Sequence, residues 1–458
     1  MMEQNNREIE ILEEIKSLIA FKEFDALLEY LESLHYIDIA DIMDEFDKEE
    51  KNTLFELIPV EFASGILEEL EPKAFSNLLK DLDDRKKHLI LDEMSQDDIV
   101  DKLEDLSDER IIEIFKHMDI EDSRMIKKLL AYESDVAGGL MTGEFISMVE
   151  DITKSEALEY LKSNAPDAET IYYTFVVDNQ RKLVGVLSLR DLILAENDTK
   201  IVEIMHRNVI SVNVYDDQEE VAQVVSKYDL LAVPVVNNFD KIVGIITVDD
   251  IIDVIEEEAT EDIMKFAGTT ENDTSEENTV FENIISSTKS RLPWLIITVF
   301  GGLLSASIVR EFQGVLNANT VLALFMPLLA GMGGNVGTQS STITVRNIAV
   351  GSIETKDIPI TLFHEITVGI IVGIICAILV AIASFILNGE LIISMIVGIS
   401  MTANIITAAT IGTVVPLVFK KINIDPAVAS APFITTTVDI TGLTIYFSMA
   451  TFLISKFG

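Results

Sequence analysis

Apolar residues recur every twelve positions along the first third of the chain. Their positions are Phe46, Ile58, Leu70, Leu82, Met94, Leu106, Met118 and Leu130. Another apolar residue precedes nearly all of them by three positions, and a residue that begins or ends helices usually follows. A short helix and a tight turn in each repeat can bury their apolar side only against neighbouring repeats. The pattern therefore predicts an α-superhelical domain over residues 1–135, with a non-repetitive helical bundle as the alternative.

From residue 136 onward the pattern changes to alternating strands and helices, and it again repeats. Residues 175–185 (FVVDNQRKLVG) align with residues 234–244 (PVVNNFDKIVG). Each copy has a β-branched run, an Asn-containing turn and a second β run that ends at Gly, which is typical of a β-hairpin. We therefore predict two α/β units, over residues 136–199 and 200–258.

The two repeated units resemble a pair of CBS (cystathionine-β-synthase type) domains. Domains of this family fold against each other and often bind adenine nucleotides. The resemblance implies that ATP binds at hydroxyl and carboxylate pairs placed before a helix, namely Ser188 with Asp191 and Thr247 with Asp250. In the alternative interpretation, each hydroxyl only caps the helix that follows it.

Long apolar stretches dominate the rest of the chain, after a polar linker at residues 268–290. They lie near residues 292–310, 319–345, 358–387, 391–419 and 427–454. Each stretch is long enough to cross a hydrocarbon core of ~30 Å. We therefore expect an all-α membrane domain with five transmembrane helices over residues 291–458, preceded by a connecting helix and linker over residues 259–290.

The orientation of the spans follows from their flanking charges. With the N-terminus inside, most of the Lys and Arg residues beyond position 290 fall on the cytosolic side. The first residues have neither the basic nor the apolar region of a signal peptide. The sequence therefore predicts a multi-pass protein of the bacterial cell (inner) membrane, with cytosolic N-terminal domains and its C-terminus outside.

Charge is distributed very unevenly between the two halves of the chain. Residues 1–290 contain 27 Lys and Arg against 70 Asp and Glu, whereas residues 291–458 contain 7 of each sign. The net charge of −43 therefore belongs entirely to the polar half. Such a surface repels itself unless cations screen or bridge it, and it makes nucleic acid an unfavourable partner. No Cys/His, Ser/His or phosphate-loop constellation indicates an enzyme.

The main candidate for chemistry inside the membrane is Asp439, near the middle of the last span. A carboxylate at that depth is costly unless it faces water, a cation or a partner. Helical spacing places further polar or small residues on the same face, namely Thr435, Thr436, Gly442 and Tyr446. This face suits the wall of a pore, and the alternative is a protonated Asp439 that hydrogen-bonds to a neighbouring helix.

The second span is unusually polar over residues 331–342, which include Asn335. This composition suits close helix packing or a pore wall that meets water. Mg²⁺ keeps most of its waters and needs only one or two carboxylates, so a homodimer would supply the pair as two copies of Asp439 around one axis. Glu365 is interpreted as an interfacial residue, and no second buried carboxylate is expected.

Acidic residues are densest at positions 249–262, where the second α/β unit leads toward the membrane domain. A run of acidic residues is usually a solvated helix face. Here, however, the neighbouring superhelical domain is also acidic, so packing the two together requires cations. Divalent ions that bridge these surfaces would hold the domains together.

These features together closely resemble the MgtE magnesium channel and transporter family, over essentially the whole chain. The resemblance rests on residues 134–142 (SDVAGGLMT), 256–262 (EEEATED), 333–339 (GGNVGTQ), and 425–426 (DP) with 437–442 (TVDITG). It implies that Asp439 selects hydrated Mg²⁺, with Asn335, Thr435 and Gly442 as the other candidates for the pore. Some family members have Asn where this chain has Ala431, which alters the pore wall there.

The resemblance also implies a set of carboxylates that bind intracellular Mg²⁺ in a closed dimer. They are Glu219, Asp229, Asp250, Asp253, Glu258, Glu261 and Asp262. The acidic connector would act as a plug helix over the pore, and ATP would raise the sensitivity to Mg²⁺. In the superhelical domain the candidates are Asp92, Glu93, Asp97 and Asp98.

The resulting hypothesis is a homodimeric Mg²⁺ channel in lipid, which mediates Mg²⁺ uptake and is closed by intracellular Mg²⁺. Two alternatives remain. One is a coupled secondary transporter that uses Asp439 as a proton relay, although the spans show no obvious inverted repeat. The other is a membrane-anchored ion or nucleotide sensor that transports nothing.

Overall fold

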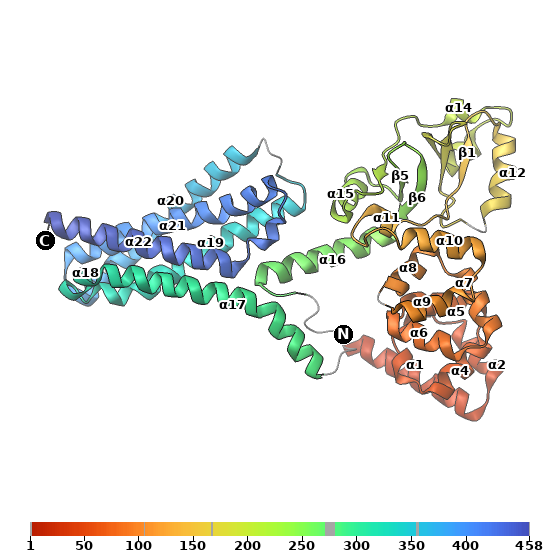
Figure 1. Ribbon diagram of the computed structural model, residues 1–458, viewed down its shortest axis with the longest axis horizontal. Helices are drawn as coiled ribbons and strands as arrows, with labels where there is room; N and C mark the ends of the chain where they lie inside the picture. Colours follow the sequence, from red (N-terminus) through yellow and green to blue (C-terminus); the bar gives the residue numbers. More distant parts are fainter. Residues whose placement is uncertain (1, 105, 166–167, 271–279, 354–356, 458) are drawn as a thin grey trace. The chain divides into compact units, whose positions relative to one another are not determined.

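The computed structural model describes residues 2–104, 106–165, 168–270, 280–353 and 357–457 (Figure 1). Its contacts divide the chain into two compact units, Met1–Val254 and Ile255–Gly458. The first unit contains the superhelical and α/β regions, and the second contains the long apolar helices.

The first unit begins with a series of short helices. They are α1 (Met2–Phe21), α2 (Phe24–Leu31), α3 (Tyr36–Ala40), η1 (Met43–Glu45), α4 (Lys48–Leu57), α5 (Val60–Glu69), α6 (Pro72–Asp81), α7 (Asp84–Glu93), α8 (Gln96–Glu104), α9 (Asp108–Phe115) and α10 (Ile120–Leu129). Helices α4 to α10 begin twelve residues apart, which confirms the repeat and the superhelical architecture.

The local chemistry of each repeat explains this spacing. The recurring apolar residue ends a helix in extended backbone and is buried, as at Ile58, Leu70 and Leu82. The next residue begins the following helix: the Asp83 carboxylate accepts hydrogen bonds from two backbone N–H groups of α7. Burial of the helix end therefore fixes the turn between repeats, and at α4 and α7 an Asp side chain also caps the start of the next helix.

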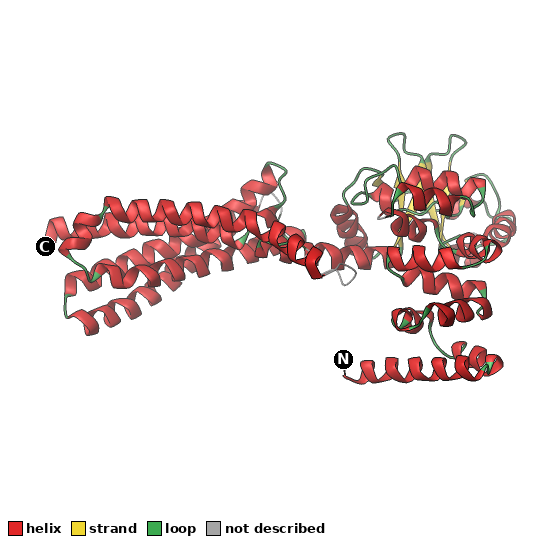
Figure 2. Ribbon diagram, turned by 60° about the horizontal axis from the view of Figure 1, so that its bottom comes forward, coloured by secondary structure: helices red, strands yellow, loops and turns green. Residues whose placement is uncertain are grey.

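The α/β region contains two three-stranded sheets of the same design. Their strands are coloured yellow in Figure 2. The strands are β1 (Ser147–Val149), β2 (Tyr173–Val177), β3 (Leu183–Ser188), β4 (Val212–Asn213), β5 (Ala232–Val236) and β6 (Ile242–Thr247). In each sheet a parallel pair is followed by an antiparallel hairpin, β2–β3 or β5–β6. Both predicted hairpins are confirmed. The helices are α11 (Ala137–Leu140), α12 (Lys154–Asn164), α13 (Leu189–Leu194), α14 (Ile201–Ile204), α15 (Gln218–Tyr228) and α16 (Val248–Ala267).

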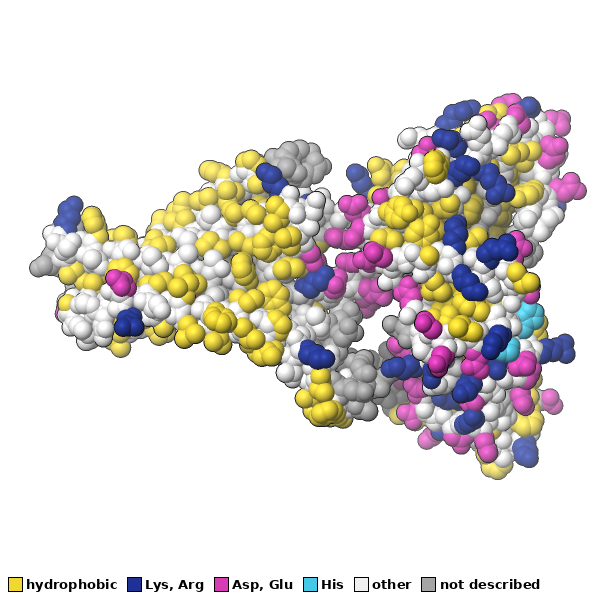
Figure 3. Space-filling model, viewed as in Figure 1, with side chains coloured by type: hydrophobic (Ala, Val, Ile, Leu, Met, Phe, Trp, Pro, Cys, Tyr) yellow, Lys and Arg dark blue, Asp and Glu magenta, His cyan; other side chains and the backbone are white. Residues whose placement is uncertain are grey.

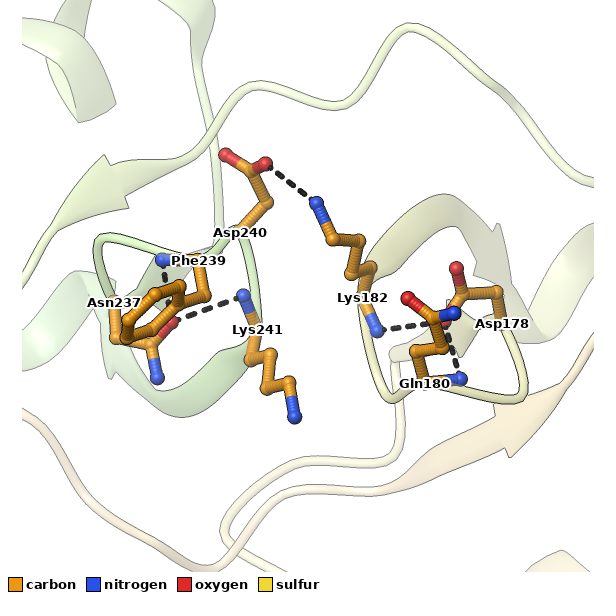
Figure 4. A network of polar contacts seen from close by, with 7 residues as sticks. All are labelled: Asp178, Gln180, Lys182, Asn237, Phe239, Asp240 and Lys241. Atoms are coloured by element: carbon orange, nitrogen blue, oxygen red, sulfur yellow. Dashed lines mark hydrogen bonds and ion pairs between the residues drawn. The ribbon is translucent and has the colours of Figure 1, made fainter.

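The tips of the two hairpins are built alike and are joined to each other (Figure 4). Asp178 in one tip and Asn237 in the other use one side-chain oxygen to accept two backbone N–H groups. The Lys182 ammonium pairs with the Asp240 carboxylate at 3.1 Å, and an isolated bridge links Lys182 to Lys241. The internal repeat therefore pairs with itself across the two α/β units, as a CBS pair would.

The second unit consists mainly of long helices. They are α17 (Val280–Glu311), α18 (Gln313–Ala318), α19 (Leu322–Ala349), α20 (Ile358–Asn388), α21 (Leu391–Lys421), η5 (Pro426–Val428) and α22 (Ala431–Phe457). Because α17 already begins at Val280, the expected linker over residues 268–290 is shorter than predicted, and residues 271–279 lie outside the described residues.

Among the described residues, four helices are long and apolar enough to cross a membrane: α17, α20, α21 and α22. Helix α19 is long enough but carries the polar run of residues 331–342, and so is less apolar. The helical membrane architecture is supported, and the count of five spans stays a prediction. Helix α21 packs against α19, α20 and α22 and has more buried residues than any other of these helices.

Close contact between α19 and α21 depends on small residues. A Cβ added to Gly412 of α21 would collide with the backbone carbonyl of Gly337 in α19. The two backbones therefore approach closely at this crossing, as small residues permit in membrane helices. Through this contact the polar run of α19 packs against the buried helix α21.

Candidate functional site

Asp439 lies on α22 among half-buried neighbours. Within the part of the chain that the structure describes, its carboxylate makes no hydrogen bond and no ion pair. The hydroxyls beside it are bound to their own helix: Thr435 donates to the carbonyl of Ala431 at 2.9 Å, and Thr436 to that of Pro432 at 2.7 Å. The carboxylate therefore remains available to water or to a cation.

The predicted polar face of α22 is divided in the structure. Asp439, Thr435 and Thr436 are half-buried, whereas Gly442 and Tyr446 face into the bundle. The hydroxyl of Tyr446 donates to the backbone carbonyl of Leu322 at 2.9 Å, so it serves helix packing. Gly442 packs closely on Asn404, since a Cβ there would meet the side-chain oxygen of Asn404. The assignment of Gly442 to the pore stays a prediction.

Asn404 of α21 is a residue that the sequence interpretation missed. It is 1% exposed, and its Nδ2 donates to the carbonyl of Leu329 at 2.7 Å. Its Oδ1 has no hydrogen-bond partner among the described residues. The side chain lies against Gly333 of α19 and Gly442 of α22. An amide inside an apolar span was the available signal, because such groups are costly there unless they have a structural or functional role.

Glu365 of α20 is the second finding that the sequence interpretation did not anticipate. It is 8% exposed and accepts a hydrogen bond from the Ser340 hydroxyl of α19 at 2.9 Å. The neighbouring His364 ring lies 3.4 Å from its other oxygen. The expectation of no second buried carboxylate is therefore wrong, since Glu365 is buried within the bundle.

The polar run of α19 presents two different sides. Gly333, Gly334 and Gly337 pack on the last helix, where a Cβ on Gly334 would lie 3.3 Å from the Thr435 methyl group. Asn335 is exposed and, among the described residues, makes no side-chain hydrogen bond. One side of the run thus serves helix packing, and the Asn335 amide is exposed on the other side.

A cluster of carboxylates forms inside the first unit, between the superhelical and α/β regions. We call these residues the carboxylate cluster: Glu68, Asp97, Asp98, Asp101, Glu169, Asp249, Asp250 and Asp253. They come from α5, α8, the segment before β2, and α16. Four of them, Asp97, Asp98, Asp250 and Asp253, were candidates from the sequence. The other four come from segments far apart in the chain.

Desolvation and mutual repulsion perturb the acidity of this cluster. Desolvation, followed by repulsion from neighbouring carboxylates, raises the pKa of Glu68, Asp101 and Glu169 to about 7. Desolvation also raises the pKa of Asp250 to about 6, although hydrogen bonds from Thr247 oppose the shift. Anionic carboxylates are thus held close together at a cost in free energy.

The centre of the carboxylate cluster is buried. Asp97 is 7% exposed, and desolvation raises its pKa well above the usual range. Next to it, Gln96 is 9% exposed, and its Oε1 has no hydrogen-bond partner among the described residues. Carboxylate and amide oxygens are the ligands that hard divalent cations prefer. The cluster therefore has the composition of a site for such cations.

The remaining predicted metal ligands are distributed over α15 and α16. Glu219 and Asp229 lie at opposite ends of α15, about 15 Å apart by helical rise, so one chain does not bring them together. Glu258, Glu261 and Asp262 belong to the segment of α16 that packs in the second unit.

Lys265 organises the end of α16. Its ammonium lies 2.6 Å from Glu261 and 2.8 Å from Asp425, the residue before η5. Desolvation, together with repulsion from Asp425 and Glu258, raises the pKa of Asp262 to about 6. Asp425 was recognised in the sequence only as a member of a motif, and its partnership with Lys265 adds it to the candidate residues.

Another acidic group lies on the superhelical region. Carboxylate oxygens of Asp92, Asp119 and Asp122 lie within 4.8 Å of one another. Desolvation raises the pKa of Asp122, and repulsion within this group adds to the shift. Of the four superhelical candidates, Asp97 and Asp98 join the carboxylate cluster, Asp92 joins this second group, and Glu93 is exposed.

The predicted nucleotide residues pair with each other. The Ser188 hydroxyl donates to the Asp191 carboxylate at 2.6 Å, and Thr247 does the same to Asp250. Ser188 also caps α13, as the alternative interpretation expected. The His206 ring lies 3.3 Å from Asp191, which adds an imidazole to the first pair. Both pairs are thus structural, and their contact with ATP stays a prediction.

The surfaces of the two units differ in the type of side chain that they expose, in agreement with the uneven distribution of charge along the sequence. Figure 3 shows hydrophobic side chains over the visible face of the long helices and charged side chains over the first unit. Many apolar side chains of α17 and α20 are exposed, among them Phe300, Leu303, Phe363 and Ile386. Such a surface suits lipid and would be unfavourable in water.

Comparison with protein families gives matches along most of the chain. A model described as "MgtE: Divalent cation transporter" matches residues 326–449, and one for the "MgtE intracellular N domain" matches residues 34–135. The CBS domain model matches residues 135–198 and 201–257.

Relatives that match over nearly their whole length agree. The chain is 36% identical over 421 residues to Magnesium transporter MgtE of Bacillus subtilis (strain 168), with 92% of each chain covered. It is 37% identical over 434 residues to the protein of that name from Thermus thermophilus, covering 94% of this chain and 95% of that one. Both relatives are named as transporters rather than enzymes, as the sequence predicts.

Among solved structures, about half of this chain is similar to a crystal structure of the cytosolic domain of the Mg²⁺ channel MgtE in complex with ATP. The identity is 38% and the TM-score 0.50, with 52% of this chain and 98% of that chain covered. The soluble part of a magnesium transporter gives 36% identity and the same TM-score, covering 56% of this chain and 99% of that one.

The carboxylate cluster predicts an unusual dependence of stability on pH. Its acids have a higher pKa in the folded state than the value of about 4 expected when unfolded. The folded state therefore binds protons more tightly between about pH 4 and pH 7, and stability falls as the pH rises through that window. Without divalent cations, the midpoint of thermal unfolding of the first unit should decrease from about pH 5 to about pH 7.5, and Mg²⁺ should restore it at the higher pH.

The variant Glu68→Gln with Asp101→Asn should flatten this dependence, measured by thermal unfolding of the full chain in detergent. Glu61→Gln, which removes an exposed carboxylate from the same helix as Glu68, is the control and should behave as the wild type. A midpoint that rises with pH in the absence of divalent cations would contradict the interpretation.

Proposed function

The chain belongs to the MgtE family of magnesium transporters, and we propose that it is a Mg²⁺-selective channel for Mg²⁺ uptake, closed when intracellular Mg²⁺ binds its acidic cytosolic domains. The observation that carries the gating mechanism is the carboxylate cluster. Its acids come from both the superhelical and the α/β regions of the first unit, and their raised pKa values reflect how unfavourable their approach is without a cation.

Mg²⁺ in the carboxylate cluster would shift the equilibrium toward the packed arrangement. A divalent cation adds two positive charges between carboxylates that otherwise repel each other. Because it gains these ligands only when α8 and α16 lie together, it binds the packed state better than a separated one. When intracellular Mg²⁺ falls, the separated state becomes more populated and the channel opens.

The end of α16 would carry this change to the pore. Lys265 joins α16 to Asp425, which directly precedes η5 and lies shortly before the last helix. The Lys265 ammonium thus already compensates carboxylates at the place where a plug helix would meet the pore. Glu258, Glu261 and Asp262 provide further carboxylates there, and Mg²⁺ bound to them would reinforce the closed position.

Selection of the ion is assigned to Asp439. Its carboxylate has no protein partner among the described residues, and the nearby hydroxyls satisfy their own helix. One carboxylate is little for a dehydrated divalent ion, but it suits Mg²⁺ that keeps its waters. A homodimer, with its second Asp439 across the axis, would complete the filter. Asn335 is exposed on α19 and would line the same path, with the C-terminus outside.

Regulation by ATP also belongs to the proposal. A solved structure similar to about half of this chain is of a cytosolic domain in complex with ATP. In this chain the candidate residues are Ser188, Asp191, Thr247 and Asp250. Asp250 is also a member of the carboxylate cluster, so a nucleotide bound there would alter the same carboxylates that bind Mg²⁺.

One observation favours a second candidate function, coupled transport. Glu365 is a buried carboxylate beside Ser340, and together with Asp439 it gives the membrane helices a pair of acids. Intramembrane carboxylates form the proton relays of pumps and transporters. A channel needs only the Asp439 filter. A coupled transporter would move protons with each Mg²⁺ and would therefore depend on a proton gradient.

Replacing Asp439 tests the filter. Asp439→Asn removes the charge that attracts hydrated Mg²⁺ while keeping the size of the side chain. Mg²⁺ uptake into proteoliposomes, followed with an internal fluorescent indicator, should fall by about tenfold or more. Glu390→Gln, which removes an exposed carboxylate at the start of α21, is the matched control and should keep normal uptake.

Adding a protonophore to the same assay separates the two functions. Uptake by the wild type should continue after the proton gradient is collapsed. If uptake stops, coupled transport is the correct function. If Asp439→Asn transports normally, the filter is elsewhere.

Removing cluster carboxylates tests the gate. Asp250→Asn combined with Asp98→Asn should leave the channel conducting at intracellular Mg²⁺ concentrations that close the wild type, because the bridging ligands are lost. Channel recordings from membrane patches, with Mg²⁺ varied on the cytosolic side, should show closure only at about tenfold higher Mg²⁺. Asp25→Asn, an exposed carboxylate of α2 outside the cluster, is the control. Unaltered closure would make the cluster a passive surface.

A further inference from the structure

A pocket on the superhelical region carries cationic groups that the proposed function does not use. It lies between α6, α7 and α9 and has a volume of about 250 Å³. Its lining includes the cationic residues Lys80, Lys87 and Arg110, with His117 beside them. These groups stand out in a chain whose net charge is −43.

Lys87 forms the buried wall of this pocket and is incompletely paired. It is 8% exposed, and the carboxylate oxygen with which it pairs, on Asp84, lies 3.8 Å away. That separation exceeds hydrogen-bond length, and its ammonium makes no hydrogen bond among the described residues. Buried charges are normally satisfied by hydrogen bonds as well as by opposite charge. An ammonium with free N–H groups beside a cavity therefore indicates a missing acceptor.

Two further donors complete the pocket wall. The Arg110 guanidinium donates to the Ser76 hydroxyl at 3.2 Å, which orients its fork over the pocket. A guanidinium has five N–H groups, so this single bond leaves most of them available. Ser76 is itself 8% exposed and keeps its own O–H for a ligand.

The start of α9 adds a further attraction for anions. Ser107 precedes the helix as its N-cap and lines the pocket, but its hydroxyl makes no capping hydrogen bond. The N–H groups at a helix start carry partial positive charge and bind anions. This hydroxyl is therefore open to a ligand in the pocket.

Carboxylates at the rim do not neutralise the pocket. Glu109 and Glu113 line it, and both are exposed. Among the described residues, neither Lys80 nor Arg110 has a carboxylate partner within 4.0 Å. The exposed rim carboxylates are well solvated, whereas the Lys87 ammonium and the Ser76 hydroxyl are buried, so an anion gains most in the inner region.

We propose that this pocket binds a small phosphoryl dianion, such as inorganic phosphate or a small phosphate monoester. A phosphate group offers acceptor oxygens to the Lys87 ammonium, the Arg110 fork and the two serine hydroxyls at once, in charge-assisted hydrogen bonds. The volume of about 250 Å³ is below the range typical for drug-sized ligands, so the pocket suits a phosphoryl group better than a whole nucleotide. Its residues are also distinct from those predicted to bind ATP in the CBS pair.

Binding can be measured on the full chain in detergent, freed of nucleotide and divalent cations. Isothermal titration with inorganic phosphate should show one saturable site per chain. Lys87→Met keeps most of the length of the buried side chain without its charge, and Arg110→Gln changes only an exposed side chain, so folding should survive at least the second change. Each should weaken phosphate binding by about tenfold or more.

Two control variants test whether phosphate binds in this pocket or elsewhere on the chain. Lys128→Gln removes an exposed lysine of α10 outside the pocket and should leave binding unchanged. Ser188→Ala removes the hydroxyl donor of the predicted nucleotide residues. Loss of phosphate binding in Ser188→Ala, but not in the pocket variants, would overturn the proposal.

A second titration, with glycerol phosphate, distinguishes the source of the phosphoryl group. Binding of both ligands identifies free phosphate as sufficient, and binding of the monoester alone identifies an ester; either result supports the site if the pocket variants weaken it. Absence of saturable binding for both ligands would mean that water fills the pocket, and equal binding in wild type and pocket variants would place the ligand elsewhere. Both of these results overturn the proposal.

Discussion

Repulsion between carboxylates is the constraint on which the first unit depends. Residues of α5, α8 and α16, far apart in the sequence, bring acids together at the boundary between the superhelical and α/β regions. Their approach becomes less unfavourable when protons or cations reduce the negative charge. An arrangement that cations stabilise can also report their concentration. The same feature that is a cost for folding is therefore the basis of the proposed sensor.

The membrane helices follow the opposite principle, since they keep very few charges. They use small residues for close contact, as between Gly337 and Gly412, and bury polar side chains such as Asn404 where these brace three helices. Because charged residues are so few in these helices, Asp439 has no protein partner among the described residues. A solvated divalent cation can use such a group without being stripped of its water.

Much of the fold could be predicted from the sequence, because its helices and hairpins depend on residues that are close together in the chain. The twelve-residue spacing predicted the helix starts from Lys48 to Ile120, and the repeated hairpin predicted both sheets. The burial of Glu365 and the position of Asn404 could not be predicted, because hydropathy does not say which side of a helix meets its neighbours. Glu68, Asp101 and Glu169 were missed for a related reason: their cluster exists only after segments far apart in the chain have packed.

Amide hydrogen exchange of the full chain in detergent, near neutral pH with and without millimolar Mg²⁺, tests the central claim most directly. If Mg²⁺ binds the carboxylate cluster, exchange in α8 and in the first turns of α16 should slow in a saturable way. Na⁺ at equal ionic strength should not reproduce the effect, because screening alone does not bridge carboxylates. Exchange rates in α8 and α16 that do not respond to Mg²⁺ would contradict the account.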